Sequence, residues 1–163
     1  MVYALRVLGI DPGSYITGYG IVEKQKSQLH HISHGEIKTS RMTSRSSCLT
    51  SIYHRLLEVI EKTSPDVAAI EDIFYGKNVK SLMRQGEVRG VAILAASQSN
   101  LPIYEYSPLE VKKAVVGYGR AEKIQVQNMV KAILNLSEIP PSDAADALAV
   151  AICHSNFLKS GNI

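Results

Sequence analysis

Four carboxylates stand where predicted structural elements begin or end. Asp11 follows the apolar run ALRVLGI, and Glu71 follows the apolar run VAAI. Asp143 and Asp146 are three residues apart, so they share one face if this segment is a helix. A charged residue at the end of a buried strand lies at the edge of the hydrophobic core and points out of it. Asp11 and Glu71 therefore lie close together if their strands are neighbours in one sheet.

Converging carboxylates repel one another, and their pKa values rise unless a cation compensates the charge. Mg²⁺ prefers oxygen ligands, and two such ions about 3.5–4 Å apart stabilise both the attacking and the leaving oxygen of a phosphodiester. Each acid alone also fits an ordinary role, such as a turn residue at Asp11 or a first-turn helix acid at Asp143. The joint pattern favours a metal site. It predicts a site for a hard divalent cation such as Mg²⁺, formed by Asp11, Glu71, Asp143 and Asp146.

Apolar patterning predicts the elements that position these acids. Continuous apolar runs are typical of buried strands, and apolar residues at helical spacing are typical of amphipathic helices. The predicted strands cover residues 4–10, 16–23, 29–38, 67–70 and 102–106. The predicted helices cover residues 47–62, 79–98, a segment starting at 108 after the capping box of Ser107 and Glu110, 121 to about 136, and 143 towards 157.

This order indicates an α/β fold with a mixed five-stranded sheet flanked by helices. The first three strands, joined by short connections, would form an antiparallel meander, and the other two are linked by helices. No linker is visible, so residues 1–163 are predicted to form a single domain. The helix at 79–98 has an apolar face that suits either the core or an interface between subunits, formed by Val79, Leu82, Met83, Val91 and Leu94.

The composition is that of a globular protein, with 45% hydrophobic and 20% charged residues, which excludes a disordered tail or a collagen-like chain. The net charge is only +3. However, residues 77–131 hold nine Lys or Arg and four Glu, whereas the rest of the chain is slightly acidic. This distribution is compatible with a phosphate-rich ligand held around an acidic centre, and equally with a solvated surface of mixed charge.

Two cysteines are too few for a disulfide framework, so Cys48 and Cys153 are predicted to be buried thiols in a reducing compartment. No stretch of about 18 apolar residues is present, so no membrane span is predicted. The N-terminus also shows no secretory leader pattern. We expect a cytoplasmic protein.

The acidic motifs, taken together, resemble those of a known family. The segments GIDPG (9–13), AIE (69–71), DAADALA (143–149), and VK (111–112) through GYGRAEK (117–123) are similar to the motifs of the RuvC family of Holliday-junction resolvases. The match covers nearly the whole chain in order. It implies a ribonuclease-H-like fold, a homodimer, and Mg²⁺-dependent cleavage of four-way DNA junctions that leaves 5′-phosphate and 3′-hydroxyl ends. It also suggests the RuvA–RuvB branch-migration complex as a partner.

The resemblance places the family's four catalytic acids on the four carboxylates named above. It places a junction-contacting aromatic on Phe74 and two important lysines on Lys112 and Lys123. The residues themselves agree, because Phe74 and Tyr75 follow Glu71 in a polar loop, where an aromatic ring can stack on an unpaired base. Basic side chains around a glycine-containing loop are typical of phosphate contacts, which adds a set of DNA-binding candidates: Lys112, Lys113, Arg120 and Lys123.

Three other functions were weighed against this one. A different ribonuclease-H-like nuclease could act on structured RNA, and a non-catalytic protein could bind junctions with vestigial acids. The segment from Asp11 to Ser14 also resembles the phosphate hairpin of actin-like and sugar-kinase-like ATPases. Those proteins need a second domain to enclose the nucleotide, for which 163 residues leave no room.

Overall fold

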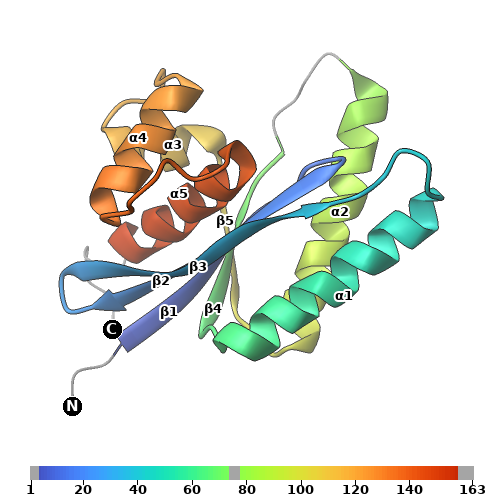
Figure 1. The fold of residues 1–163 in the computed structure, drawn as a ribbon, viewed down its shortest axis with the longest axis horizontal. Coiled ribbons are helices and arrows are strands. Elements are labelled where there is room, and N and C mark those ends of the chain that lie inside the picture. The colour runs from blue at the N-terminus through green and yellow to red at the C-terminus, as the bar shows by residue number, and fades with distance from the viewer. Residues whose placement is uncertain (1–3, 74–77, 158–163) are drawn as a thin grey trace.

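The computed structural model describes residues 4–73 and 78–157, and its centre is a mixed five-stranded sheet (Figure 1). The spatial order of the strands is β3-β2-β1-β4-β5. Their bounds are β1 Ala4–Asp11, β2 Ile16–Gln25, β3 Gln28–Lys38, β4 Val67–Glu71 and β5 Ile103–Tyr106. The predicted meander is confirmed, since β1 pairs antiparallel with β2, and β2 with β3.

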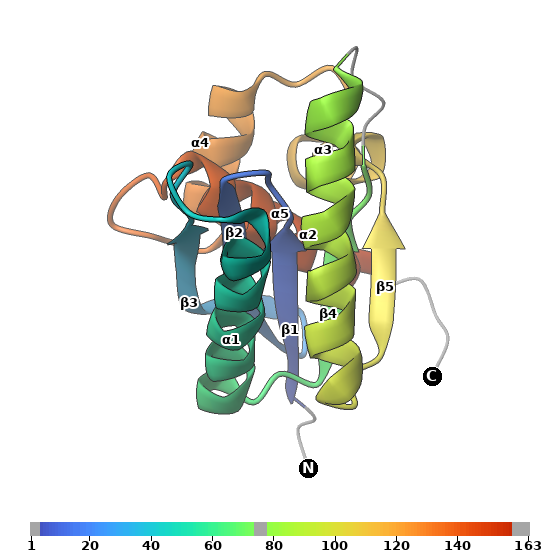
Figure 2. The same cartoon turned by 90° about the vertical axis from the view of Figure 1, so that its right-hand side faces the viewer.

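Five helices cover the two faces of this sheet, as Figures 1 and 2 show. Their bounds are α1 Arg45–Thr63, α2 Val79–Gln98, α3 Pro108–Val116, α4 Lys123–Ile133 and α5 Ser142–Phe157. Helices α1 and α2 pack on one face, with a core that includes Leu8, Ile52 and Val88. Helices α3, α4 and α5 pack on the other, with a core that includes Val7, Val130 and Leu148. The predicted α/β, ribonuclease-H-like architecture is confirmed.

The helix boundaries follow from their capping residues. Ser107 caps α3 in the predicted capping box with Glu110, and Pro108 stands at the first turn. Gly117 ends α3 in the left-handed conformation, at a φ of 93°, which suits glycine. Helix α4 is shorter than predicted and ends at Ile133, because Leu134 already leaves the helical conformation and Asn135 takes a positive φ of 50°.

The register of the central strands decides where the functional side chains lie. β1 pairs in parallel with β4, with Ile10 opposite Ile70, so Asp11 and Glu71 extend from neighbouring strands at the same edge. From the sequence alone, Asp11 and Glu71 were predicted to be close only on the condition that their two strands were neighbours. Helix α5 then crosses over β1 and β2 and brings its first turn to the same edge.

Glycines in β1 and β2 allow α5 to approach the sheet closely. A Cβ atom at Gly9 would overlap the backbone carbonyl oxygen of Ala147 and would lie 2.9 Å from the nitrogen of Ala151. A Cβ at Gly18 would overlap the carbonyl oxygen of Asp143. The obstructing atoms belong to the backbone, so a change of rotamer cannot relieve the overlap. The two glycines therefore set the distance between the sheet and the acids of α5.

We predict that Gly9→Ala destabilises the protein by about 1–3 kcal/mol or more, because the added methyl group forces α5 away from β1. Urea denaturation followed by circular dichroism measures this change. A Gly9→Ala protein as stable as the parent would show that the close contact between α5 and β1 is not required.

Candidate active site

The four predicted acids converge at one edge of the sheet. Asp11 closes β1 and is only 9% exposed. Its carboxylate and those of Asp143 and Asp146, from the first two turns of α5, have oxygens that all lie within 4.8 Å of one another. Glu71 closes β4 and reaches the same place, where its side chain shares a hydrogen bond with Asp11. Among the described residues, Asp11, Asp143 and Asp146 are the one group of three or more His, Cys, Asp or Glu side chains close enough to share a metal ion.

Burial and mutual repulsion raise the pKa values of three of these acids. The pKa of Asp11 is raised well above its ordinary value, first by desolvation and then by the charges of Glu71, Asp146 and Asp143. The pKa of Glu71 is raised to about 7, first by desolvation and then by Asp146. The pKa of Asp146 is raised mainly by desolvation. Protein atoms alone therefore leave this site with a deficit of positive charge.

Two lysines reduce that deficit from the side of α3 and α4. Lys123 Nζ lies 3.1 Å from a carboxylate oxygen of Asp146. Lys112 lines the same cavity of about 250 Å³ as Glu71, Asp146 and Lys123. Both lysines oppose the rise in the pKa values of Glu71 and Asp146. The sequence predicted these lysines as phosphate contacts and gave no sign of the ion pair, which depends on how α4 packs against α5.

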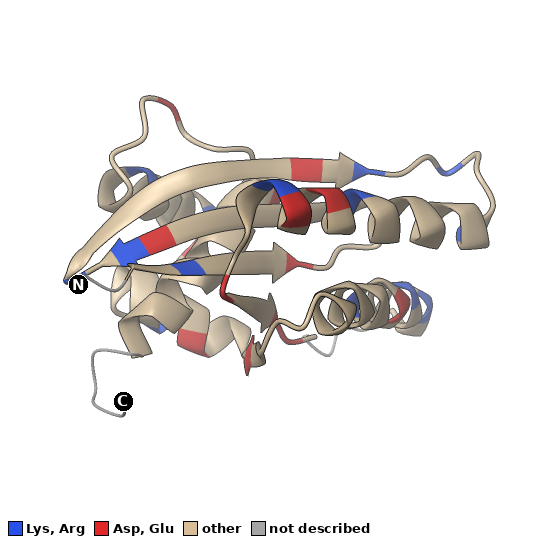
Figure 3. Ribbon diagram, turned by 90° about the horizontal axis from the view of Figure 1, so that it is seen from below, with Lys and Arg blue, Asp and Glu red and all other residues tan. Residues whose placement is uncertain are grey.

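The structure describes only some of the other residues that the sequence predicted to contact DNA. Lys113 and Arg120 are exposed, and Lys112 is half-buried, all around the turn between α3 and α4. Figure 3 colours the basic and acidic positions of the ribbon. Phe74 and Tyr75 lie outside the described residues. The predicted buried thiols are confirmed, since Cys48 and Cys153 are both buried and unpaired.

Comparison with known proteins identifies the family. The family model for crossover junction endodeoxyribonuclease RuvC matches residues 7–154. The crossover junction endodeoxyribonuclease RuvC of Caldicellulosiruptor saccharolyticus is 54% identical over 161 residues, which cover 98% of this chain and 96% of that protein. The chain belongs to the RuvC family.

Solved structures agree with this assignment. RuvC of Thermus thermophilus in complex with a Holliday junction substrate superposes with a TM-score of 0.88 at 35% identity, covering 94% of each chain. The yeast mitochondrial Holliday junction resolvase Ydc2 has a TM-score of 0.64 over 91% of this chain and 77% of its own. At 16% identity, Ydc2 supports the fold alone. Within the described residues, no helix is long and apolar enough to cross a membrane.

The donor set of this RuvC-family chain fits a hard divalent cation. All the donors are carboxylate oxygens, which Mg²⁺, Mn²⁺ and Ca²⁺ accept and which soft metals disfavour. Three of these carboxylates, those of Asp11, Asp143 and Asp146, are within bridging distance of a single ion. The raised pKa values of Asp11 and Asp146 indicate that a positive charge at this place would be favourable. The acidic cluster can therefore hold a metal ion.

The raised pKa values predict how the stability of the metal-free protein depends on pH. A carboxyl whose pKa is higher in the folded state binds its proton more tightly there than in the unfolded chain, so stability falls as the pH rises. For Glu71 the fall spans the range from its ordinary value of 4.5 to about 7. Asp11→Asn removes one charge and keeps the hydrogen bond, so this variant should be more stable than the parent at pH 8, by on the order of 1–3 kcal/mol.

Urea denaturation in the presence of a chelator measures this difference, which should shrink towards zero near pH 4. Asp66→Asn is the control, because Asp66 lies just before β4, at the opposite end from Glu71, and accepts a backbone hydrogen bond of 2.7 Å from Arg6. A parent that is as stable at pH 8 as at pH 5, with no gain from Asp11→Asn, would contradict the proposed repulsion.

Proposed function

We propose that this protein resolves Holliday junctions in DNA recombination and repair by metal-dependent hydrolysis, making symmetric paired nicks that leave 5′-phosphate and 3′-hydroxyl ends. The convergence of Asp11, Glu71, Asp143 and Asp146 at one edge of the sheet carries this proposal. Family membership supports the reaction, and the solved complex of the Thermus thermophilus relative supports a four-way junction as substrate. We also propose a cytoplasmic location, where such an enzyme would have access to chromosomal DNA.

The proposed ligands of Mg²⁺, with Mn²⁺ as a substitute, are the four carboxylates. When bound, one or two such ions would supply Lewis acidity and neutralise the charge that develops on the phosphodiester. The side chains of Asp11 and Glu71 are in hydrogen-bonding contact and the pKa values of both are raised, so a bound cation would favour their ionised forms. The ammonium group of Lys123 holds Asp146 in place through their ion pair.

The basic side chains beside the acids are proposed to bind the DNA backbone. Lys112 faces the shared cavity, and Lys113 and Arg120 are exposed beside it, so a phosphate at the cluster has cations on the side of α3 and α4. These groups orient the scissile phosphate for in-line attack by water, while Phe74 and Tyr75 are proposed to stack on unpaired bases.

We predict that Asp11→Asn and Asp143→Asn abolish cleavage and leave junction binding within about threefold of the parent, because amide oxygens keep the shape of the site but bind Mg²⁺ poorly. A synthetic mobile junction, end-labelled in turn on each strand, reports both quantities. The parent should make paired nicks at symmetric positions. Asp66→Asn is again the control and should cleave like the parent.

The same experiment separates the alternative functions. Structured RNA cleaved in preference to the junction would indicate a different nuclease, and metal-independent binding without nicking would indicate a binding protein alone. Cleavage by Asp11→Asn at the parental rate would contradict the catalytic assignment. Addition of RuvA–RuvB tests the proposed partner, with the rate of paired nicking as the readout.

A two-fold dimer is proposed, because a junction must be nicked on two strands and a symmetric pair of sites matches a symmetric substrate. Helix α2 offers the interface. Val79 and Met83 are 68% and 65% exposed, and Leu94 is 49% exposed, which is unusual for large apolar side chains on one helix. Leu82 and Val91, also named from the sequence, are half-buried.

We predict that Met83→Asp converts a dimer into a monomer. A carboxylate in the middle of this apolar face would be buried in the interface without an opposite charge, which is strongly unfavourable. Light scattering coupled to size-exclusion chromatography measures the mass of parent and variant. Met42→Asp, at a side chain that is 96% exposed in the segment between β3 and α1, is the control and should remain dimeric. A parent that is monomeric throughout, or a dimeric Met83→Asp, would contradict this interface.

A further inference from the structure

A second group of cations lies where the turn after β1 meets the segment before α1 and the first turns of α2. We call it the Tyr15 cluster, and it consists of Tyr15, Arg41, Lys80 and Arg84. The guanidinium carbon of Arg41 lies 4.5 Å from the centre of the Tyr15 ring, and that of Arg84 lies 5.6 Å from it. Arg84 also donates a hydrogen bond to the Tyr15 hydroxyl. One aromatic ring thus holds two arginines from distant parts of the chain.

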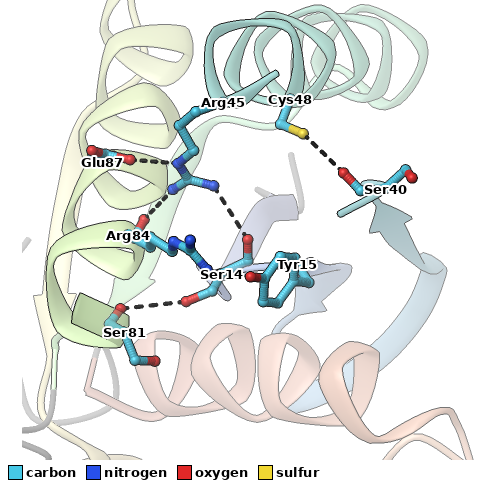
Figure 4. Close-up of polar contacts among 8 residues, drawn as sticks. All are labelled: Ser14, Tyr15, Ser40, Arg45, Cys48, Ser81, Arg84 and Glu87. Atoms are coloured by element: carbon cyan, nitrogen blue, oxygen red, sulfur yellow. Dashed lines mark hydrogen bonds and ion pairs between the residues drawn. The ribbon is translucent and has the colours of Figure 1, made fainter. Parts of the chain in front are cut away.

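Arg45 fixes this arrangement, as Figure 4 shows. Its guanidinium donates to the carbonyl oxygen of Arg84 at 2.6 Å and to that of Ser14 at 3.4 Å, and it pairs with Glu87 at 2.5 Å. The hydroxyl of Ser14 in turn donates to the carbonyl of Ser81 at 3.4 Å. The turn, the start of α1 and the first turns of α2 are therefore tied together, and the charge of Arg45 is already neutralised by Glu87.

The remaining cations of the cluster have no such neutralisation. Within residues 4–73 and 78–157, no ion pair is recorded for Arg41, Lys80 or Arg84, whereas several other arginines are paired with carboxylates. A cavity of about 200 Å³ opens between Tyr15, Lys80 and Arg84. That volume is several times the roughly 30 Å³ that one water occupies, so it admits a phosphate group with part of its hydration. Like charges held together around a polar cavity favour an anion.

The position of the cluster relates it to the acids. Tyr15 follows Asp11 by four residues, so the turn lies within roughly 14 Å of Asp11 along even a fully extended chain. That upper limit corresponds to at most about four base-pair steps of rise along a DNA helix axis. Lys112 and Lys123 lie on the opposite side, on α3 and α4. The acidic site is therefore flanked by cations on both faces of the sheet.

We infer that the Tyr15 cluster binds a backbone phosphate of the junction strand a few nucleotides from the one being cleaved. This inference rests on the proposed function and adds to it a contact on the side of α1 and α2. The planar guanidinium groups of Arg41 and Arg84 bind two oxygens of one phosphate each or share a single phosphate, and the Tyr15 ring holds them in place for that contact. The Tyr15 cluster and the lysines of α3 and α4 would then bind the DNA strand on both sides of the acids and hold it across them.

The test uses junction DNA with Arg41→Gln and Arg84→Gln, each in the cleavage-deficient Asp11→Asn background. Each variant should weaken binding about tenfold near physiological salt, as expected for loss of a charge-assisted hydrogen bond. Each should also make the slope of log affinity against log salt shallower by about one. Arg41 makes no side-chain hydrogen bond to the described part of the chain, so Arg41→Gln tests the inference even if Arg84→Gln proves poorly folded in thermal melts.

Arg55→Gln is the matched control, because Arg55 is an exposed arginine within α1 that pairs with Glu58 on the same helix. This variant should bind like the parent. Arg41→Gln and Arg84→Gln proteins that match Arg55→Gln in affinity and salt slope would overturn the inference. If the parent itself neither binds nor nicks the junction, the proposed function is wrong instead, so the two failures are distinguishable.

A junction with a single neutral methylphosphonate, moved one position at a time, locates the contact. At the phosphate that the cluster binds, the neutral linkage should weaken the parent about tenfold and leave Arg84→Gln unchanged, as in a double-mutant cycle. Equal penalties for parent and variant at all positions would overturn the inference.

Discussion

The structure depends on the repulsion among four carboxylates that the fold holds together in a partly buried place. Without a cation, burial and this repulsion together raise the pKa values of Asp11, Glu71 and Asp146 and lower the stability of the folded chain above their ordinary titration range. A divalent ion bound by these carboxylates would remove this loss of stability and would supply the Lewis acidity that hydrolysis needs. The same interaction therefore links folding, metal binding and the proposed hydrolysis.

Three local features impose this convergence. Parallel pairing of β1 with β4 brings Asp11 and Glu71 to one edge. Gly9 and Gly18 let α5 lie against the sheet closely enough for Asp143 to reach Asp11. Cations then approach from both faces, through Lys123 on one side and the Tyr15 cluster on the other. The acids supply the metal site, and the cations supply the means to hold a polyanionic strand over it.

Most of this architecture could be predicted from the sequence. Apolar runs and helical periodicity predicted all ten elements within a few residues. Asp11 and Glu71 stood out because they end apolar runs, and Asp143 and Asp146 because their spacing places them on one helix face. The order of strands could only be stated conditionally, because pairing between β1 and β4 depends on contacts about 60 residues apart. The Lys123–Asp146 ion pair and the packing of two arginines on Tyr15 involve side chains from separate elements, and no local pattern marks them.

The central claim is that these four carboxylates bind divalent metal, and a crystal structure of the protein soaked in Mn²⁺ tests it most directly. Anomalous scattering should show one or two strong peaks in contact with oxygens of Asp11, Glu71, Asp143 and Asp146, and these peaks should disappear in Asp11→Asn. An anomalous map with no peak among these residues, in crystals where Mn²⁺ occupies other sites, would contradict the account.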